Sequence, residues 1–335
     1  MTRRVWILAC IALLVTAGTV WDSADAATQW KPTRPITVIV PWPAGGASDT
    51  TARMIAAQME AALGQRLVIV NTAGGGGAIG TKETWERPHD GYTLTGNANT
   101  SIVSYAVLGQ LDITHRDWQY LYPMYTPNVI AVKKDSPLKT VDDLIAAMKA
   151  RPGAVTVASA GVGSSGHLGA EVFRFATGTT YRHVPYAGGA PAVLAVASGE
   201  SEVVMQLSIE VAEMLRGGRL RALAVTTKAP LEIDGYGKIP GISILNFDDF
   251  GSYFGLMAPK DLPADVSASL EAAFKQAAAT DAVKTYAKQK GGISVAVSGK
   301  EAYDLTEHFA RRVAWLLHDG GLAKRSPQEL NIPKP

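Results

Sequence analysis

The chain has 335 residues, of which 32 are basic and 30 acidic, and its formal net charge is +2 at pH 7. This near balance, without a basic block, argues against a nucleic-acid-binding protein, which needs clustered Lys and Arg to neutralise phosphates. The length suits one large domain or two ordinary ones.

A secretory signal peptide is predicted for residues 1–26. Arg3 and Arg4 form a short basic region, residues 6–20 are apolar, and residues 24–26 read Ala-Asp-Ala, the small-x-small pattern of a signal peptidase site. A single membrane anchor is the alternative, but the apolar run is shorter than the roughly 20 residues that span a bilayer. We therefore expect cleavage after Ala26 and a periplasmic chain of 309 residues (335 − 26).

Cys10 is the only cysteine and lies inside the apolar run. Residues 7–10 resemble a lipoprotein cleavage site, but cleavage there would leave almost no apolar region in front of it. The mature chain is therefore expected to have no disulfide, no thiol nucleophile and no cysteine-ligated metal. A chain of this length buries a core large enough to be stable without disulfides.

The first half of the chain alternates predicted strands and helices. A helix is predicted at 48–63, because apolar residues recur there every three or four positions. Another is expected to begin after Thr140, which forms a variant of the capping box with Asp143, and to end at residues 151–153 (Arg-Pro-Gly). The strands predicted in this half, from apolar runs rich in β-branched residues, are 36–40, 67–70 and 92–95.

The pattern restarts near residue 154 with a strand, a glycine turn and a helix. Pro191 at a predicted helix start and Gly199 at its end show the usual asymmetry of helix termini. The tail from residue 263 is predicted to be mostly helical. The strands predicted in this half are 154–158, 181–184, 203–207 and 220–225.

This alternation predicts an α/β fold with mainly parallel sheets. The two strand–turn–helix units, near residues 45 and 163, indicate two similar lobes. Ligands of open α/β sheets bind beyond the carboxyl ends of the strands. Two lobes whose strand ends face each other would therefore form a ligand cleft.

Four glycine-rich turns follow predicted strands, at residues 41–49, 71–80, 161–167 and 185–191. Glycine lets backbone N–H groups come close to a ligand. A helix that begins at such a turn presents unpaired N–H donors and a partial positive charge, which bind anions. One turn of this kind is as often only a tight turn, but four in one chain favour a ligand site.

Nucleotide binding is not supported by these turns. Gly161, Gly163 and Gly166 fit G-x-G-x-x-G. The acidic residue that a dinucleotide site needs at the end of the next strand is absent from residues 184–186. The sequence at residues 80–82, Gly-Thr-Lys, does not match a phosphate-binding P-loop.

Catalysis and metal binding are not predicted either. Ser164 and Ser165 lie close to His167, but the G-x-S-x-G spacing of a serine hydrolase is absent. A serine beside a histidine at a helix start is more often a helix cap. No two of the six histidines have metal-ligand spacing. We therefore expect a protein that is not an enzyme and has no metal or cofactor.

Six segments, read together, carry a family resemblance: residues 41–49 with Ala52 and Arg53, Asn71 with 74–80, 90–94, 161–168, 183–186 with Gly188 and 191–192, and 220–225. Over residues 33–323 the chain resembles the solute-binding proteins of tripartite tricarboxylate transporters, the Bordetella uptake gene (Bug) type. The resemblance implies a two-lobed type II periplasmic binding protein that captures a small organic carboxylate and hands it to membrane transporter subunits. It also implies that backbone amides, hydroxyls and water hold the carboxylate, and that Arg and Lys do not. A binding protein that signals to a membrane sensor is the alternative, and an exported hydrolase is the least favoured interpretation.

Three positions depart from the family pattern. Trp42 replaces the usual Phe or Tyr, and with Tyr186 on the other side of the cleft it would favour a ligand with a hydrocarbon or aromatic body. Ala187 stands where a basic residue is common. Gln206 stands where an acid is common, which makes a ligand with an amino group less favoured.

The predicted architecture is a monomer of two lobes. Lobe one comprises residues 27–128 and 254–335, and lobe two comprises residues 129–253. Gly46 is expected to tolerate no larger residue, because a Cβ atom would block the approach of a ligand to the N–H groups. The predicted ligand-binding residues are Trp42, Ala44, Gly45, Gly46, Ala47, Ser48, Asp49, Gly76, Asn97, Asn99, Thr100 and Ser101 in lobe one, and Ser164, Ser165, His167, Tyr186, Gly188 and Gln206 in lobe two.

Overall fold

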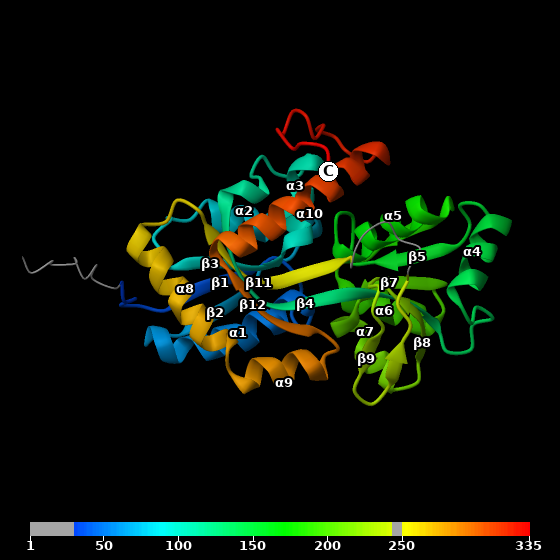
Figure 1. The fold of residues 1–335 in the computed structure, drawn as a ribbon, viewed down its shortest axis with the longest axis horizontal. Coiled ribbons are helices and arrows are strands. Elements are labelled where there is room, and N and C mark those ends of the chain that lie inside the picture. Colours follow the sequence, from blue (N-terminus) through cyan, green and yellow to red (C-terminus); the bar gives the residue numbers. More distant parts are fainter. Residues whose placement is uncertain (1–29, 243–249) are drawn as a thin grey trace, which may run out of the picture.

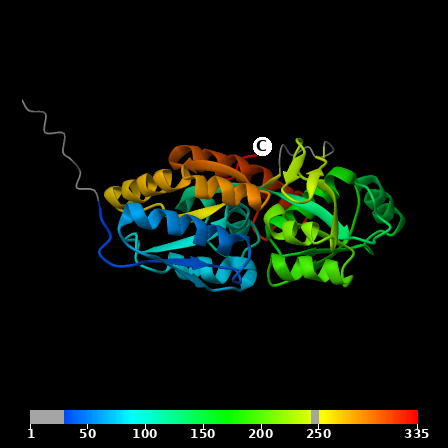
Figure 2. The same ribbon diagram turned by 90° about the horizontal axis from the view of Figure 1, so that it is seen from below.

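A computed structural model describes residues 30–242 and 250–335, and it shows two α/β lobes joined side by side (Figures 1 and 2). The predicted signal peptide, with Cys10 and the cleavage site at Ala26, lies outside the described residues. Within the described residues, no helix is both long enough and apolar enough to cross a bilayer.

The strands of both lobes belong to one sheet, in the order β2-β1-β3-β11-β4-β7-β5-β6, with β12 and β8 also paired to β4. In lobe one, β1 pairs in parallel with β2 and β3. In lobe two, β5 pairs in parallel with β6 and β7. The strand bounds are β1 Ile36–Val40, β2 Leu67–Asn71, β3 Thr93–Ala98, β4 Trp118–Lys133, β5 Thr156–Ser159, β6 Arg182–Pro185, β7 Val203–Leu207, β8 Leu220–Val225, β11 Gly251–Pro259 and β12 Ile293–Ser298; a separate hairpin consists of β9 Leu231–Ile233 and β10 Gly237–Ile239.

The prediction of mainly parallel sheets is wrong, because β4 and β11 join the lobes through antiparallel pairs. The first part of β4 pairs with β11 and β12, and from Asn128 onward β4 pairs with β7 and β8. One strand leaves lobe one and the other returns to it, so the two run in opposite directions. The junction is therefore a pair of hydrogen-bonded strands, and the partners of β4 change between Pro127 and Asn128.

The helices cover the faces of the sheet. In α1 the residues Ala52, Ile55 and Met59 are fully buried and keep helical spacing, as predicted. The capping box of Thr140 and Asp143 is present, and Gly199 ends α6 in the left-handed conformation. The helix bounds are α1 Ala47–Leu63, α2 Ala78–Trp85, α3 Asn99–Val107, α4 Val141–Ala150, α5 Ser165–Thr177, α6 Gly189–Ser198, α7 Ser208–Arg216, α8 Ala264–Ala278, α9 Asp281–Gln289 and α10 Gly299–Asp319; short 3₁₀ turns occur at Gly75–Gly77 and His115–Asp117.

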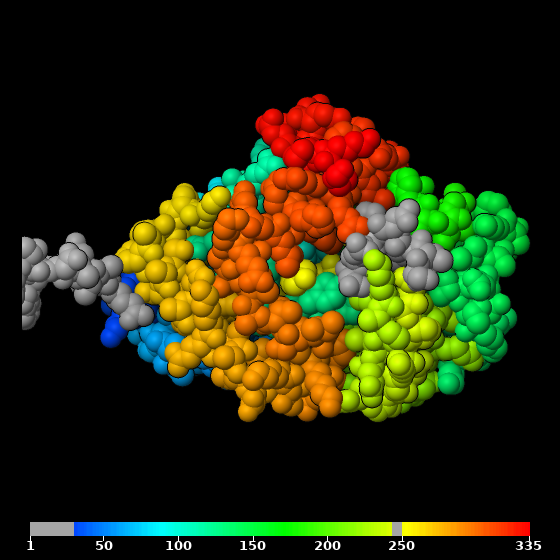
Figure 3. Space-filling model, in the orientation of Figure 1, coloured from blue at the N-terminus to red at the C-terminus, as the bar shows by residue number. Residues whose placement is uncertain are grey.

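The C-terminal tail contributes helices α8, α9 and α10 and the strand β12, which was not predicted. The buried residues Val313 and Leu317 of α10 share a hydrophobic cluster with Val103 of α3 and with Leu168 and Val172 of α5. The helix therefore packs against both lobes. Figure 3 shows the C-terminal part of the chain, in orange and red, lying beside the junction on one face, with yellow and teal parts of the chain still visible next to it.

Candidate functional site

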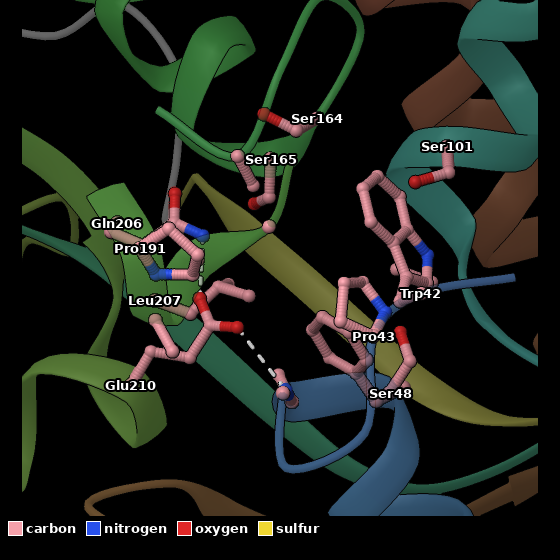
Figure 4. Close-up of a pocket in the computed structure, with 18 of the residues that line it drawn as sticks. Trp42, Pro43, Ser48, Ser101, Ser164, Ser165, Pro191, Gln206, Leu207 and Glu210 are labelled. Atoms are coloured by element: carbon pink, nitrogen blue, oxygen red, sulfur yellow. Dashed lines mark hydrogen bonds between the residues drawn. The ribbon is translucent and has the colours of Figure 1, made fainter. Parts of the chain in front are cut away.

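A cavity of about 310 Å³ lies between the lobes, and five of the described helices begin at its wall. The helices are α1, α3, α5, α6 and α7, and each follows the carboxyl end of a sheet strand. The first backbone N–H groups of a helix have no intrahelical acceptor, so the wall presents donors and partial positive charge. The lining residues are Trp42, Pro43, Ala44, Gly46, Ala47, Ser48, Ala98, Thr100, Ser101, Ala160, Ser164, Ser165, Gly188, Gly189, Ala190, Pro191, Leu194, Gln206, Leu207, Glu210 and Phe254 (Figure 4).

The structure brings many, but not all, of the predicted site residues to this cavity. Those on its wall are Trp42, Ala44, Gly46, Ala47, Ser48, Thr100, Ser101, Ser164, Ser165, Gly188 and Gln206. Those predicted but not on its wall are Gly45, Asp49, Gly76, Asn97, Asn99, His167 and Tyr186. The residues of the second group form contacts with other parts of the protein, as the next paragraphs describe.

Asp49 and Gly45 shape the turn that precedes α1. The Asp49 carboxylate accepts hydrogen bonds from the Gly45 amide at 2.8 Å and from Asn71 Nδ2 at 2.9 Å, and it forms an ion pair with Arg53 at 2.9 Å. Burial alone would raise the pKa of Asp49, but the hydrogen bonds from Arg53, Gly45 and Asn71 lower it. The partners of this carboxylate are therefore the turn before α1, the helix α1 itself and the end of β2, and none of these partners lies on the cavity wall.

Asn97 and Asn99 position other residues. Asn97 Oδ1 accepts the indole N–H of Trp42 at 3.0 Å, while its Nδ2 donates to Thr81 and Tyr105. Asn99 Oδ1 accepts the amide of Tyr253 at 3.0 Å. The ring of Trp42 is therefore held at the wall of the cavity by a buried amide, which is consistent with its predicted orientation toward the cleft.

Tyr186 and Gly76 do not have their predicted positions. The Tyr186 hydroxyl donates to Glu200 at 2.9 Å, and the ring packs on the core of lobe two, so it does not oppose Trp42. Apolar side chains of Pro191 and Leu194 line the cavity from lobe two. A Cβ on Gly76 would lie 2.9 Å from the Val162 carbonyl oxygen, so this turn contacts lobe two outside the cavity.

Packing of the protein requires glycine at two positions other than Gly46. Gly46 has φ −74°, and a Cβ there would come no closer than 3.5 Å to any neighbour. A Cβ on Gly189 would overlap the Glu210 carboxylate at 1.9 Å, and one on Gly166 would lie 2.2 Å from the Met205 carbonyl oxygen. The requirement for glycine at Gly46 stays a prediction, since it concerns the approach of a ligand from the cavity and not crowding by the protein. Gly166 and Gly189 are required for packing, because they allow helices to approach β7 and α7 closely.

Hydroxyl groups connect the lobes behind the cavity. Ser252 of β11 donates to Ser165 at 2.5 Å and shares a hydrogen bond with Thr100 at 3.0 Å. Ser165 Oγ donates to Asn128 Oδ1 at 3.2 Å. Ser104 of α3 donates to the Gly163 carbonyl oxygen at 3.1 Å. The N-terminus of α5 is thus tied to lobe one at two points.

His167 and His183 form a stacked pair beneath the α5 turn, with ring centroids 4.3 Å apart. His167 Nδ1 accepts the Gly163 amide at 3.2 Å, and His183 Nε2 shares a hydrogen bond with Ser159 at 2.7 Å. Burial and the neighbouring His167 lower the pKa of His183 to about 4, and burial lowers that of His167. The pair therefore supports the turn in its neutral form.

This pair predicts a loss of stability at mildly acidic pH. Because the pKa of His183 is about 6.5 in the unfolded chain and about 4 in the folded protein, its contribution is complete above about pH 6.5 and decreases as the pH falls toward 4. Since His183 is only partly buried, we expect it to account for about 1–2 kcal/mol between pH 7 and pH 5. Urea denaturation of wild type and His183→Gln at both pH values measures this, with His318→Gln at an exposed site as control. An unchanged pH dependence in His183→Gln would refute it.

Several residues on the described wall were not predicted, and Glu210 is the one among them that carries a charge. It lies in the first turn of α7, four residues after Gln206, and its Oε1 accepts the Ala47 amide of α1 at 3.1 Å. Its Oε2 accepts the side-chain amide of Gln206. Burial raises the pKa of Glu210, while these two hydrogen bonds oppose the rise. An acid in the first turn after a buried strand was the available signal, but its partner Ala47 is 163 residues away.

The cavity wall carries no basic side chain among the described residues, since none of its members is Lys, Arg or His. Within the same residues, no three His, Cys, Asp or Glu side chains are grouped so that they could hold a metal ion. Its chemistry is that of helix N-termini, hydroxyls, one buried carboxylate and apolar surface. Two α/β lobes, joined by strands and enclosing such a cavity at their strand ends, define a two-lobed solute-binding protein.

Comparison with known proteins gives the family. Residues 51–321 match the tripartite tricarboxylate transporter family receptor (TctC) family, and the chain belongs to this family, as its resemblance indicated. It is 34% identical to protein BugT of Bordetella pertussis over 267 residues, 78% of this chain and 79% of BugT. It is 32% identical over 296 residues to a UPF0065 protein of Pseudomonas sp. strain P51, with 85% of each chain covered.

A solved structure supports the same assignment. The R. palustris protein solved with adipate is 27% identical and superposes with a TM-score of 0.79, covering 87% of this chain and 99% of that one. The predicted two-lobed binding-protein fold is therefore confirmed. The fold and family are those of periplasmic solute-binding receptors.

Proposed function

We propose that this protein binds a small organic carboxylate in the cavity between its lobes and delivers it to the membrane subunits of a tripartite transporter. The observation that carries the proposal is the convergence of five helix N-termini on a cavity without basic side chains. Backbone N–H groups and the hydroxyls of Ser48, Ser101 and Ser164 would bind the carboxylate. Relatives of this family have been solved with adipate and with malate.

The cavity suits a ligand with an apolar body. Trp42, Pro43, Pro191, Leu194 and Phe254 present carbon surface to it. A very small polar acid such as oxalate would leave that surface in contact with water. The protein acts by binding and release, without catalysis; delivery of a signal to a membrane sensor is the alternative, and co-purification with a permease distinguishes the two.

The remaining parts of the proposal concern the whole chain. Export is followed by cleavage after Ala26, and the mature protein works as a monomer. Lobe one consists of residues 27–128 and 254–335, and lobe two of residues 129–253. The change of partners of β4 at Asn128 supports the first boundary, while β11 already pairs with lobe one strands at Phe254.

Native mass spectrometry of the purified protein, followed by calorimetric titration of carboxylates, tests the function. A carboxylate bound with a Kd in the micromolar range or below is expected, and a ligand at 100 times its Kd should add about 2.7 kcal/mol to the free energy of unfolding. Turnover of the bound acid, or binding only of molecules without a carboxylate, would overturn the proposal.

Trp42 tests the position of the ligand. We expect Trp42→Ala to weaken binding of the best carboxylate about tenfold, because it removes a ring that contacts the ligand body. Trp42→Phe keeps a ring but loses the hydrogen bond to Asn97, so it should lose less affinity. Calorimetry on variants whose unfolding matches wild type decides this. Unchanged affinity in Trp42→Ala would show that the ring belongs only to the core.

A further inference from the structure

Glu210 is the only ionisable side chain on the described wall of the cavity. It extends from the first turn of α7 toward the N-terminus of α1 (Figure 4). Its carboxylate is enclosed by Ala47, Gln206 and Gly189, where a Cβ would overlap Oε2. The absence of a side chain at Gly189 leaves the space that the carboxylate occupies.

The hydrogen bonds of this carboxylate are incomplete. An ionised carboxylate has about four acceptor positions, and the structure supplies two donors, Ala47 N–H and Gln206 Nε2. Gln206 Oε1 is itself buried and has no partner among the described residues. Burial raises the pKa of Glu210 and only those two hydrogen bonds oppose it, with no contribution from a basic side chain. At this end of the cavity, acceptor positions of Glu210 and Gln206 are therefore unfilled, and the described wall has no basic side chain to fill them.

The opposite side of the cavity has the reverse character. Ser101 and Ser164 lie across from Glu210 in Figure 4, at the starts of α3 and α5. These helix starts offer N–H and O–H donors. At α1, the Ala47 amide is already used by Glu210. A ligand carboxylate is thus directed to the serine side and away from Glu210.

We infer that Glu210 selects carboxylates that also carry an ammonium group, so that the preferred ligand is an amino acid in the general sense, bound with its carboxylate at the serine side and its ammonium at Glu210. This inference rests on the proposed function. The ammonium group of such a ligand would supply hydrogen-bond donors to the unfilled acceptor positions of Glu210 and Gln206. A dicarboxylate would instead place a second negative charge near Glu210 in a wall without any basic side chain, where like charges repel strongly. An acidic residue is common in the family at the position of Gln206; in this chain, Glu210 places a carboxylate on the cavity wall four residues later.

Ligands of equal length and different charge test the inference. Calorimetric titrations compare 6-aminohexanoate, adipate and hexanoate, then the four-carbon set 4-aminobutyrate, succinate and butyrate, and norleucine for an α-amino group. The protein is the full mature chain, freed of bound ligand by unfolding and refolding. We expect at least one amino-carboxylate to bind about 100-fold more tightly than the dicarboxylate of its length.

The isosteric variant Glu210→Gln links this preference to the residue. It keeps an oxygen for the Ala47 amide but removes the charge, so the amino-carboxylate should lose about 100-fold in affinity and the dicarboxylate should gain about tenfold. Glu213→Gln removes a charge from the exposed side of the same helix and should change neither. Thermal unfolding of both variants checks that the fold is retained.

The outcomes separate this inference from the proposed function. Tighter binding of adipate or succinate by wild type, with the same ratio in Glu210→Gln, overturns the role of Glu210 and leaves carboxylate binding intact. Binding of hexylamine or butylamine as tight as that of the amino-carboxylate overturns carboxylate binding and leaves Glu210 as a cation site. Binding of no compound in the series overturns both.

Discussion

Replacing Gly166 with alanine is expected to destabilise the protein by about 3 kcal/mol and to abolish ligand binding. A Cβ at this position would lie 2.2 Å from the Met205 carbonyl oxygen, a backbone atom in the buried strand β7, and 2.0 Å from Gln206 Oε1. Because the strand cannot move away, α5 must shift outward, and overpacking of this kind is among the most costly core changes. The shift would also displace Ser164 and Ser165 from the cavity.

Urea denaturation followed by circular dichroism measures the loss of stability, and calorimetry measures binding. Gly178→Ala is the matched control at the other end of α5. Gly178 ends the helix in the left-handed conformation, with nothing within 4 Å of a Cβ. It should therefore cost only about 1 kcal/mol and leave binding intact. A Gly166→Ala protein that is as stable as the control and still binds ligand would contradict the close approach of α5 to β7.

Replacing Glu307 with glutamine is expected to cost about 2–4 kcal/mol of stability at pH 7. The Glu307 carboxylate of α10 is shared by His115 at 2.7 Å and by Arg116, whose Nε and Nη2 lie at 2.9 and 2.7 Å. Arg116 also donates to the carbonyl oxygens of Leu330 and Asn331, so the cluster connects α10, the segment before β4 and the C-terminal tail. Removing the charge leaves Arg116 without this counter-ion in a partly buried place.

The same variant should change the response to acid. Hydrogen bonds from His115 and Arg116 hold the pKa of Glu307 well below its usual range. Its contribution to stability is therefore complete above the pKa of the unfolded chain, about 4.3, and is lost as the pH falls below it. Urea midpoints at pH 7 and pH 3.5 should differ less in Glu307→Gln than in wild type. Glu301→Gln, at an exposed position of α10, should behave like wild type; an equal acid response in all three proteins would refute the role of the cluster.

Local features of this fold were readable from the sequence. The bounds of β1, β7 and β8 were predicted to the residue, because each is a short apolar run between turn residues. The capping box at Thr140 and the C-cap at Gly199 were also predicted, since such signals depend on residues three or four positions apart.

Extended crossings between the lobes were expected near residues 128–132 and 253–257, but the length and the pairing of the junction strands were not predicted. In β4 nearly every residue from Trp118 to Val132 is buried, so the strand shows none of the alternation that marks a half-exposed strand. Its partners β11 and β12 come more than a hundred residues later. The mixed character of the sheet follows from these distant pairings and has no local signature.

The sequence by itself determined the family, the two-lobed class and the turns that surround the cavity, because these depend on glycines, helix starts and strand ends within short segments. Only the tertiary structure decided which side chains of those turns reach the cavity. The Tyr186 hydroxyl donates a hydrogen bond to Glu200, and the Asp49 carboxylate forms an ion pair with Arg53. Glu210 lies on the cavity wall, where it accepts the amide of Ala47 from the other lobe. Side-chain direction at a cleft is set by packing between segments far apart in the chain, and no spacing within one segment encodes it.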